Sequence, residues 1–126
     1  MEKKRIVVVD DNTEMRDLMK AVLAQHYDTV AISDPALALD TIRKTKPHLV
    51  LLDLNMPGMS GWTIYNAMRD DEDMEDIPVI IVTASKESLD RLFGLHIAHV
   101  TNYLTKPFLV TELLDSIAKA LEAPPD

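Results

Sequence analysis

The chain has 126 residues, 47% of them hydrophobic, which suits a single domain with a real core, and its lack of cysteine excludes disulfides, thiolate metal sites and cysteine nucleophiles. Its formal net charge of -8 argues against direct nucleic-acid binding, because phosphate backbones are met by clustered lysine and arginine. No apolar stretch approaches the ~20 residues of a membrane span, and residues 1–5 lead directly into a strand-like run, so we expect a cytoplasmic protein without membrane contact.

The beginning of the chain predicts two pairs of strand and helix. A β-branched run at 5–9 predicts the first strand, and the next segment carries one apolar helical stripe, made of Met15, Leu18, Met19, Val22 and Leu23. The second strand is predicted at 29–32. Asp34 then has the position of a helix cap and Pro35 that of the first helical residue, and this second helix ends before Pro47.

The rest of the chain predicts three more pairs. A leucine-rich run at 48–52 predicts the third strand, and a shorter helix precedes the acidic run 70–76. The fourth strand is predicted at 77–82, before a helix that Ser85 caps and whose apolar stripe is Leu89, Leu92, Phe93, His96 and Ile97. The fifth strand is predicted at 100–104, and the last helix carries the stripe Leu114, Ile117, Ala118 and Leu121.

The strand-like runs are continuous, which is typical of strands buried on both faces of a parallel sheet. Because strand and helix alternate five times, the sequence predicts an α/β fold, a doubly wound parallel sheet of five strands joined by right-handed crossovers. We expect one domain over residues 1–122, with 123–126 as a short tail or the start of a linker. In such folds the ligand site lies beyond the carboxyl ends of the strands.

Polar residues follow four of the predicted strands at that edge. They are Asp10 and Asp11 after the first strand, Asp53 after the third, Thr83 after the fourth and Lys106 after the fifth. Each pair of like charges at ~4 Å costs about 4 kcal/mol at an effective dielectric constant of ~20, which a divalent cation would offset. Mg²⁺ takes carboxylates, waters and phosphate oxygens. The pattern therefore predicts a magnesium site that receives a phosphoryl group.

Among these residues, Asp53 is the predicted nucleophile. It follows a central strand, and Gly58 and Gly61 lie close behind it in the sequence, so it is the carboxylate most open to an incoming substrate. Phosphoryl transfer needs positioning and charge neutralisation above all, so Lys106, the Thr83 hydroxyl and the metal would be enough to hold the phosphoryl oxygens.

The chain resembles the receiver domain of two-component response regulators over essentially its whole length. The resemblance rests on four segments in a fixed order: Asp10-Asp11, residues 53–61, Thr83-Ala84 and residues 103–108. It implies a flavodoxin-like (βα)5 fold with the strand order 2-1-3-4-5. It also implies a signalling phosphoacceptor that assists only its own phosphorylation and dephosphorylation, and not an enzyme acting on other substrates.

The resemblance assigns the phosphoryl chemistry to one aspartate and its neighbours. Asp53 is implied as the phosphoacceptor, supplied by the phosphohistidine of a sensor histidine kinase or a phosphotransfer protein, or by a small donor such as acetyl phosphate. Asp10, Asp11 and Asp53, together with the main-chain carbonyl of Asn55, are implied as the ligands of Mg²⁺, with Mn²⁺ as an alternative ion.

The resemblance also assigns a switch. Thr83 is implied as the hydroxyl that moves toward the new phosphate, Lys106 as its cationic partner and Tyr103 as the aromatic residue that turns inward on activation. The Lys106-Pro107 peptide bond is expected to be cis. The switched surface would consist of the fourth helix, fifth strand and fifth helix, where an unidentified output partner or a weak homodimer of an otherwise monomeric protein would form.

Two segments depart from the family pattern. The residues before Tyr103 are 98–102, Ala-His-Val-Thr-Asn, where the family often has Ala-Gly-Ala-Asp-Asp. This change affects the surface between the fourth helix and the fifth strand. Leu109 stands where a helix-capping residue is frequent, so we expect the last helix to begin one turn later, capped by Thr111.

Other kinds of protein share part of this pattern. Phosphatases of the haloacid-dehalogenase type also phosphorylate an aspartate, but they carry an Asp-x-Asp pair on the first strand, whereas Asp10 and Asp11 are adjacent. A flavin-binding protein would share the fold, but this acid pair would repel the flavin phosphate. Asp11 and Glu14 could be a capping box alone. A receiver-like interaction module that does not turn over phosphate stays open as the alternative function.

Overall fold

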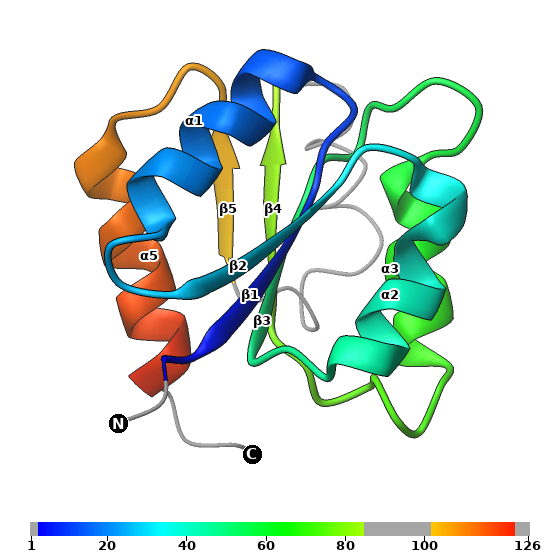
Figure 1. The fold of residues 1–126 in the computed structure, drawn as a ribbon. Coiled ribbons are helices and arrows are strands. Elements are labelled where there is room, and N and C mark those ends of the chain that lie inside the picture. The colour runs from blue at the N-terminus through cyan, green and yellow to red at the C-terminus, as the bar shows by residue number, and fades with distance from the viewer. Residues whose placement is uncertain (1–2, 85–101, 123–126) are drawn as a thin grey trace.

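A five-stranded parallel sheet lies at the centre of the fold. The computed structural model describes residues 3–84 and 102–122. Its strands form one parallel sheet in the order β2-β1-β3-β4-β5 (Figure 1), and they are β1 (Arg5–Val9), β2 (Asp28–Ile32), β3 (Leu49–Leu52), β4 (Val79–Thr83) and β5 (Asn102–Thr105). This order confirms the predicted flavodoxin-like fold. The helix predicted after Ser85 and the segment 98–101 lie outside the described residues.

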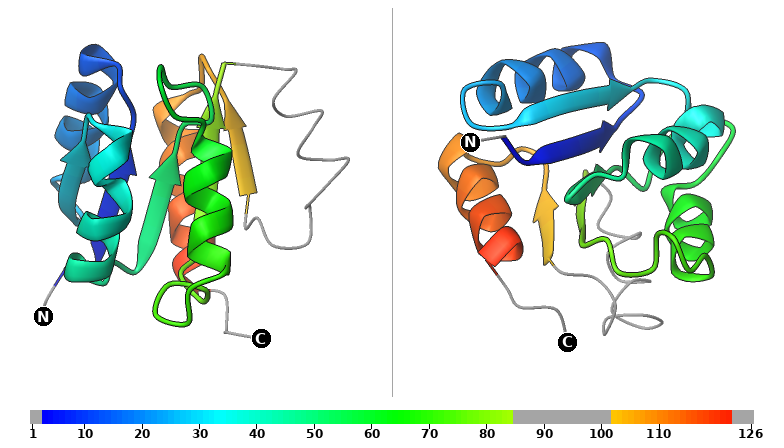
Figure 2. Two further views of the ribbon diagram at one scale, coloured as in Figure 1. Left: turned by 90° about the vertical axis from the view of Figure 1, so that its right-hand side faces the viewer. Right: turned by 60° about the horizontal axis from the view of Figure 1, so that its bottom comes forward.

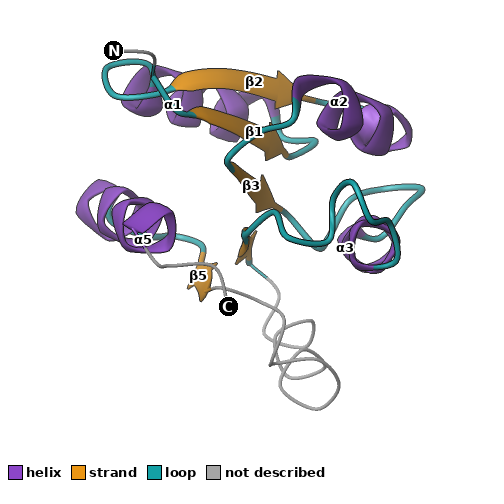
Figure 3. Ribbon diagram, turned by 90° about the horizontal axis from the view of Figure 1, so that it is seen from below, coloured by secondary structure: helices purple, strands orange, loops and turns teal. Residues whose placement is uncertain are grey.

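Helices cover both faces of this sheet. They are α1 (Thr13–Leu23), the short 3₁₀ helix η1 (Pro35–Leu37), α2 (Ala38–Thr45), α3 (Gly61–Arg69) and α5 (Val110–Glu122). Helices α1 and α5 lie on one face, and α2 and α3 lie on the other (Figures 2 and 3). Within the described ranges, no helix is both long enough and apolar enough to span a bilayer.

The core consists of two apolar layers, one on each face of the sheet. Successive side chains of a strand point to opposite faces, so each strand contributes to both layers. The layer under α2 and α3 contains the strand residues Val7, Val9, Val50, Leu52, Val79 and Ile81. The layer under α1 and α5 contains Ile6, Val8, Leu49, Leu51, Ile80 and Val82. Burial on both faces explains why the strand sequences are continuously apolar.

The starts of the first two helical segments show which residues are caps. The Asn12 side chain accepts a hydrogen bond from the Met15 N–H, so Asn12, and not Asp11, caps α1. The Asp34 side chain accepts from the Ala36 N–H, and Pro35 is the first residue of η1, as predicted. Asp11 therefore has no structural duty as a helix cap.

The start of α5 differs from the expectation. The helix begins at Val110, and not a turn later with Thr111 as its cap. The main-chain N–H of Leu109, just before the helix, donates to Oε1 of Glu112 at 2.9 Å. This is the reciprocal half of a capping box, in which the third helical residue satisfies the N–H before the helix. Because Glu112 supplies the hydrogen bond, the apolar side chain of Leu109 is tolerated there.

Strand β1 has its predicted bounds, and where the ends of other strands differ from the predicted ends, they do so by one or two residues. Strand β4 begins at Val79, two residues later than predicted, because Pro78 has no N–H to donate to a neighbouring strand. The Pro78 carbonyl still accepts from the Val50 N–H at 3.0 Å. Strand β4 also continues to Thr83, which brings this hydroxyl to the last position of the strand.

Candidate functional site

The pairing of β1 with β3 brings two aspartates side by side. Val9 and Leu52 are register partners in these parallel strands, so Asp10 and Asp53 are the next residues on neighbouring strands. The Asp53 N–H donates to the Val9 carbonyl at 3.0 Å, which extends the ladder to this point. Strands in a sheet lie about 4.8 Å apart, so the register alone brings the two carboxylates together. Asp10 is 1% exposed and Asp53 is 6% exposed.

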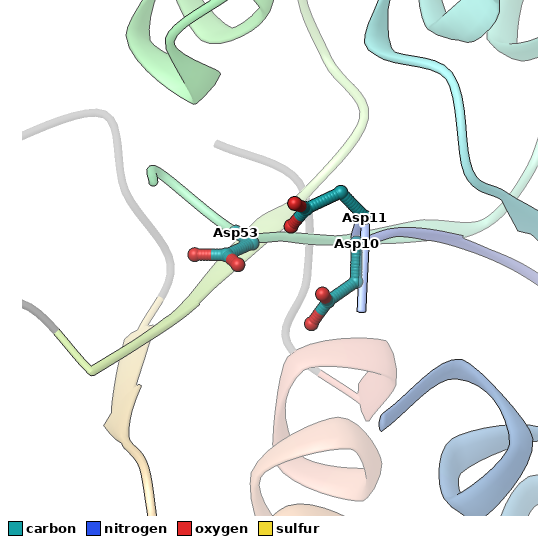
Figure 4. Close-up of side chains that lie close together, drawn as sticks. All are labelled: Asp10, Asp11 and Asp53. Carbon is teal, nitrogen blue, oxygen red and sulfur yellow. The ribbon is translucent and has the colours of Figure 1, made fainter. Parts of the chain in front are cut away.

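A third carboxylate completes the cluster. Asp11 is more exposed than its neighbours, and oxygens of Asp10, Asp11 and Asp53 all lie within 4.8 Å of one another. Figure 4 shows the three side chains grouped at the carboxyl ends of β1 and β3. Within residues 3–84 and 102–122, Asp11 takes part in no hydrogen bond or ion pair, so it is the carboxylate with no existing contact to lose.

Lys106 supplies positive charge from the end of the edge strand β5. Its Nζ lies 2.8 Å from Oδ2 of Asp10 and 3.3 Å from Oδ2 of Asp53, and its side chain is 16% exposed. The residue follows β5, its main-chain N–H donates to the Thr83 carbonyl at 3.0 Å, and the peptide bond to Pro107 is cis. One ammonium group therefore bridges the two buried carboxylates.

Main-chain donors satisfy the other oxygens of these carboxylates. Asn12 N–H donates to Oδ1 of Asp10 at 2.9 Å, and Asn55 N–H donates to Oδ1 of Asp53 at 3.0 Å. Both donors lie two residues after their aspartate, where the chain turns away from the strand. Each buried carboxylate thus has one oxygen on a main-chain N–H and one on Lys106, as buried charges require.

The pKa values reflect competition between burial and these partners. Burial raises the pKa of Asp53, and the Asp10 charge adds to this effect, while the Asn55 N–H and Lys106 oppose it without cancelling it. Burial lowers the pKa of Lys106, but the hydrogen bond to Asp10 and the charges of Asp53 and Asp10 outweigh burial, so the net pKa is raised. The site therefore keeps its ammonium charged and makes ionisation of Asp53 costly.

The two predicted switch residues lie on neighbouring strands. Thr83 is fully buried at the end of β4, and its register partner on β5 is Thr105, directly before Lys106. Tyr103 lies two residues earlier on β5 and is 40% exposed. Thr83 therefore lies at the carboxyl end of β4, on the same edge of the sheet as the carboxylates, and Tyr103 is partly exposed.

Glycine is required where α3 approaches the Asp53 segment. The Gly61 N–H donates to the Leu54 carbonyl at 3.0 Å, and a Cβ at residue 61 would collide with the Asp53 carbonyl oxygen and lie 2.8 Å from the Leu54 Cα. The start of α3 therefore packs directly against the main chain of Asp53. Gly58, in the same loop, has φ +82°, a conformation that favours glycine.

The carboxylate cluster suits a small divalent cation. Lys106 is the one cation in direct contact with these carboxylates in the described ranges, which leaves two of the three negative charges without a counter-charge. Carboxylate oxygens are the hard ligands that Mg²⁺ and Mn²⁺ prefer. Opposite ligands in an octahedral magnesium site lie about 4.2 Å apart, so small side-chain rotations of Asp11 and its neighbours would close the 4.8 Å cluster around one ion.

Sequence reasoning missed two residues beside the acid pair. One is Asn12, both cap of α1 and donor to Asp10. The other is Arg16, whose Nη1 donates to the Asp10 main-chain carbonyl at 2.9 Å. A usable signal was present, because side chains in a helix lean toward its N-terminus, and a cation early in the first predicted helix would reach back to the strand end.

Comparison with known proteins identifies relatives along nearly the whole chain. The response regulator receiver domain family matches residues 6–118. The DNA-binding response regulator MtrA of Mycobacterium tuberculosis (strain ATCC 25618 / H37Rv) is 34% identical over 120 residues, which are 94% of this chain and 51% of MtrA. The transcriptional regulatory protein BaeR of Escherichia coli O6:H1 is 36% identical over 118 residues, covering 93% of this chain and 48% of BaeR.

Solved structures show the same fold. The BeF3-activated N-terminal receiver domain of Klebsiella pneumoniae RstA superposes with a TM-score of 0.82 at 28% identity, covering 94% of this chain and 99% of that domain. A CheY-like receiver domain protein from Methanospirillum hungatei JF-1 gives a TM-score of 0.85 at 26% identity, with 96% and 95% covered.

The expectation of no direct nucleic-acid binding is wrong. MtrA is named a DNA-binding response regulator, and this chain spans about half the length of the curated relatives that it matches. The physical reason for the error is that a net charge of -8 describes these 126 residues alone. It carries no information about the half of such proteins that the match does not cover.

Proposed function

Since the chain belongs to the response regulator receiver domain family, a family of signalling domains, we propose that it is the phosphoacceptor domain of a two-component pathway and that Asp53 accepts the phosphoryl group. The observation that carries this proposal is the contact of one ammonium, Lys106, with the carboxylates of both Asp10 and Asp53 at the carboxyl ends of the strands. Such an arrangement prepares Asp53 for the arrival of further negative charge.

The proposed reaction transfers a phosphoryl group to a carboxylate oxygen of Asp53. The donor atom is a nitrogen of phosphohistidine or an oxygen of acetyl phosphate. An Asp53 carboxylate oxygen forms a bond to phosphorus, while the bond from phosphorus to the imidazole nitrogen of a kinase or phosphotransfer-protein phosphohistidine breaks. With acetyl phosphate, the bond from phosphorus to the acetate oxygen breaks instead, and acetate leaves. The product is an acyl phosphate on Asp53 in both cases.

The residues around Asp53 have proposed roles of their own. Asp10, Asp11 and Asp53, with the Asn55 main-chain carbonyl, would hold Mg²⁺ or Mn²⁺. When bound, the ion would supply positive charge to the phosphoryl oxygens as negative charge develops on them. The Lys106 ammonium would move from Asp53 to a phosphate oxygen. This movement would be short, because Nζ already lies 2.8 Å from Oδ2 of Asp10 and 3.3 Å from Oδ2 of Asp53.

We propose that the signal leaves the site through β4 and β5. Phosphate adds negative charge and strong acceptor oxygens at the end of β3. Thr83, at the end of β4, would donate its hydroxyl to the phosphate, and Tyr103 on β5, 40% exposed, would turn inward. Together with α5 and the helix predicted after Ser85, this would change the surface that an output partner recognises. We also propose that the domain occupies residues 1–122, because α5 ends at Glu122.

The test is intact mass spectrometry after incubation with acetyl phosphate and Mg²⁺. The wild-type protein is expected to gain one phosphoryl group, Asp53→Ala none, and Asp17→Ala, an exposed carboxylate on α1, as much as the wild type. A wild-type mass that stays unchanged with acetyl phosphate and with a phosphorylated histidine donor would contradict the proposal and favour the interaction module that does not turn over phosphate.

A further inference from the structure

Asp10 is held at every one of its polar groups. Its N–H donates to the Ile32 carbonyl at 3.2 Å, and its carboxylate oxygens accept from Asn12 and Lys106. Its main-chain carbonyl accepts from Nη1 of Arg16 at 2.9 Å. This last contact comes from a charged side chain on α1 and serves none of the steps of the proposed reaction.

The direction in which the Asp11 side chain points is set by its main chain. Its carboxylate has no hydrogen-bond or ion-pair partner in the part of the chain that the structure describes. The carbonyl of Asp10 and the N–H of Asp11 belong to one planar peptide unit. A donor that holds this carbonyl therefore restricts rotation of the whole unit, and with it the direction in which the Asp11 side chain leaves the backbone.

Arg16 is itself held firmly enough to act as such a donor. Its N–H donates to the Asn12 carbonyl at 3.0 Å, and its Nη2 lies 3.2 Å from Oγ1 of Thr13. The guanidinium group is a rigid planar fork, so the two side-chain contacts fix its orientation together. Because the Arg16 side chain leans back toward the N-terminus of α1, it reaches the Asp10 carbonyl at the end of β1.

We propose that Arg16 is a positioning residue for the metal site: its guanidinium fixes the Asp10-Asp11 peptide unit, and so holds Asp11 where its carboxylate can ligate a divalent cation beside Asp10 and Asp53. This inference rests on the proposed function, since it presumes that the cluster binds such an ion. It adds a residue that touches neither the ion nor the phosphoryl group.

The charge of Arg16 by itself predicts the opposite effect. A cation near the carboxylates repels Mg²⁺, so removing Arg16 would strengthen Mg²⁺ binding if charge were the whole effect. Loss of positioning weakens binding instead, by about tenfold, the lower end of the range for residues that orient metal ligands. The sign of the change in Mg²⁺ affinity therefore separates the two explanations.

Thermal unfolding across a series of Mg²⁺ concentrations tests the proposal. The unfolding temperature without Mg²⁺ reports the contribution of Arg16 to the fold, and its rise with Mg²⁺ reports affinity. Arg16→Ala is expected to bind Mg²⁺ about tenfold more weakly than the wild type. Arg16→Lys, which keeps the charge and a donor, is expected to lie closer to the wild type. Lys20→Ala removes an exposed cation from the same helix and is expected to leave the affinity unchanged.

Each other outcome has a definite meaning. An Arg16→Ala protein with a lower unfolding temperature but unchanged Mg²⁺ affinity, or with tighter Mg²⁺ binding, would overturn the proposal. If this variant does not fold, Thr13→Val removes only the partner of Nη2 and is expected to show a smaller loss of affinity; no loss would overturn the proposal. A wild type insensitive to Mg²⁺ would overturn both this inference and the proposed metal site, whereas intact Mg²⁺ binding without phosphorylation would overturn the proposed function alone.

Discussion

Burial opposes the charge of Asp53 more strongly than its partners support it. Its pKa is raised above the ordinary value of 3.8, first because of desolvation, although the Asn55 N–H and Lys106 both favour the ionised form. The folded protein therefore binds a proton here more readily than the unfolded chain does. Stability contributed by this group is present below its ordinary pKa and is lost as the pH rises through the raised value.

Asp53→Asn is therefore expected to stabilise the protein in the absence of divalent ions. Asparagine keeps an oxygen for the Asn55 N–H and removes the ionisation that folding disfavours. The free energy of unfolding, measured with urea and a chelator, should exceed that of the wild type at about pH 7, and the difference should shrink toward about pH 4. Asp17→Asn, at an exposed position, should show no such pH dependence. An Asp53→Asn protein that is less stable than the wild type at neutral pH would contradict the conclusion that ionisation of the buried Asp53 destabilises the fold.

Lys106→Met is expected to have the opposite effect. Methionine keeps the apolar stem but leaves Asp10 and Asp53 buried together without their shared cation, and breaking such a buried contact costs about 3 kcal/mol. Urea unfolding at neutral pH measures this loss. Because the pKa of Lys106 is raised from 10.5, its stabilisation is present below that value and fades as the pH rises through the folded pKa. A loss no larger than that of Lys20→Met would show that the bridge contributes nothing.

At the scale of secondary-structure elements, the site depends on how α3 begins. Gly61→Ala would force a methyl group against the Asp53 carbonyl, and overpacking of this kind costs about 1–3 kcal/mol. The strain falls on the segment that carries Asp53, so we expect a smaller Mg²⁺-dependent rise in unfolding temperature as well. Urea and thermal unfolding measure the two effects.

Gly58→Ala is the matched control for this prediction. A Cβ at residue 58 meets nothing within 4 Å, but the φ of +82° makes the substitution cost about 1–2 kcal/mol through backbone strain alone. We expect Gly58→Ala to lower stability while the Mg²⁺-dependent rise stays that of the wild type. Equal losses of Mg²⁺ response in both variants would show that the contact between α3 and Asp53 has no special part in the site.

The elements that sequence reasoning predicted correctly are those whose signal is local. Strand β3 is continuously apolar because both of its faces are covered, and the order of strands and helices follows from such runs. Asp34 and Pro35 mark the start of η1 by their own chemistry. The polar side chains after the strands could be assigned to one site from the sequence, because parallel strands present their carboxyl ends at one edge of the sheet.

One error and two omissions arose where a contact joins residues that the local pattern treats separately. The start of α5 depends on Glu112, three residues after Leu109, whose own apolar side chain has no oxygen to cap a helix. The close approach of Gly61 to the Asp53 carbonyl depends on packing between a helix and a strand end. The Arg16 contact with the Asp10 carbonyl depends on the angle at which α1 leaves β1. The Glu112 and Arg16 contacts had a signal in the spacing of the residues, whereas the approach of Gly61 to Asp53 follows from neither propensity nor periodicity.

At the scale of the whole molecule, the proposed site connects residues from most strands of the sheet. Its carboxylates and ammonium follow β1, β3 and β5, and Thr83 is the last residue of β4, so four of the five strands bring proposed site residues to their carboxyl ends. Both core layers lie behind these strands, one under α2 and α3 and the other under α1 and α5. A cation bound to the carboxylates would therefore be linked to unfolding of the whole sheet, and not only to the order of the loops around it.

Hydrogen exchange can test this linkage. The amides of Val8 and Leu51 lie in the central strands β1 and β3, and both residues are almost fully buried, so they should exchange only through global unfolding. At a free Mg²⁺ concentration ten times the dissociation constant, the population of unfolded chain falls about elevenfold, and exchange at both amides should slow by this factor. A control at equal ionic strength in KCl excludes screening, and Asp53→Ala should lose the effect. Slowing confined to the loops after β1 and β3 would mean that the ion orders its ligands without stabilising the fold.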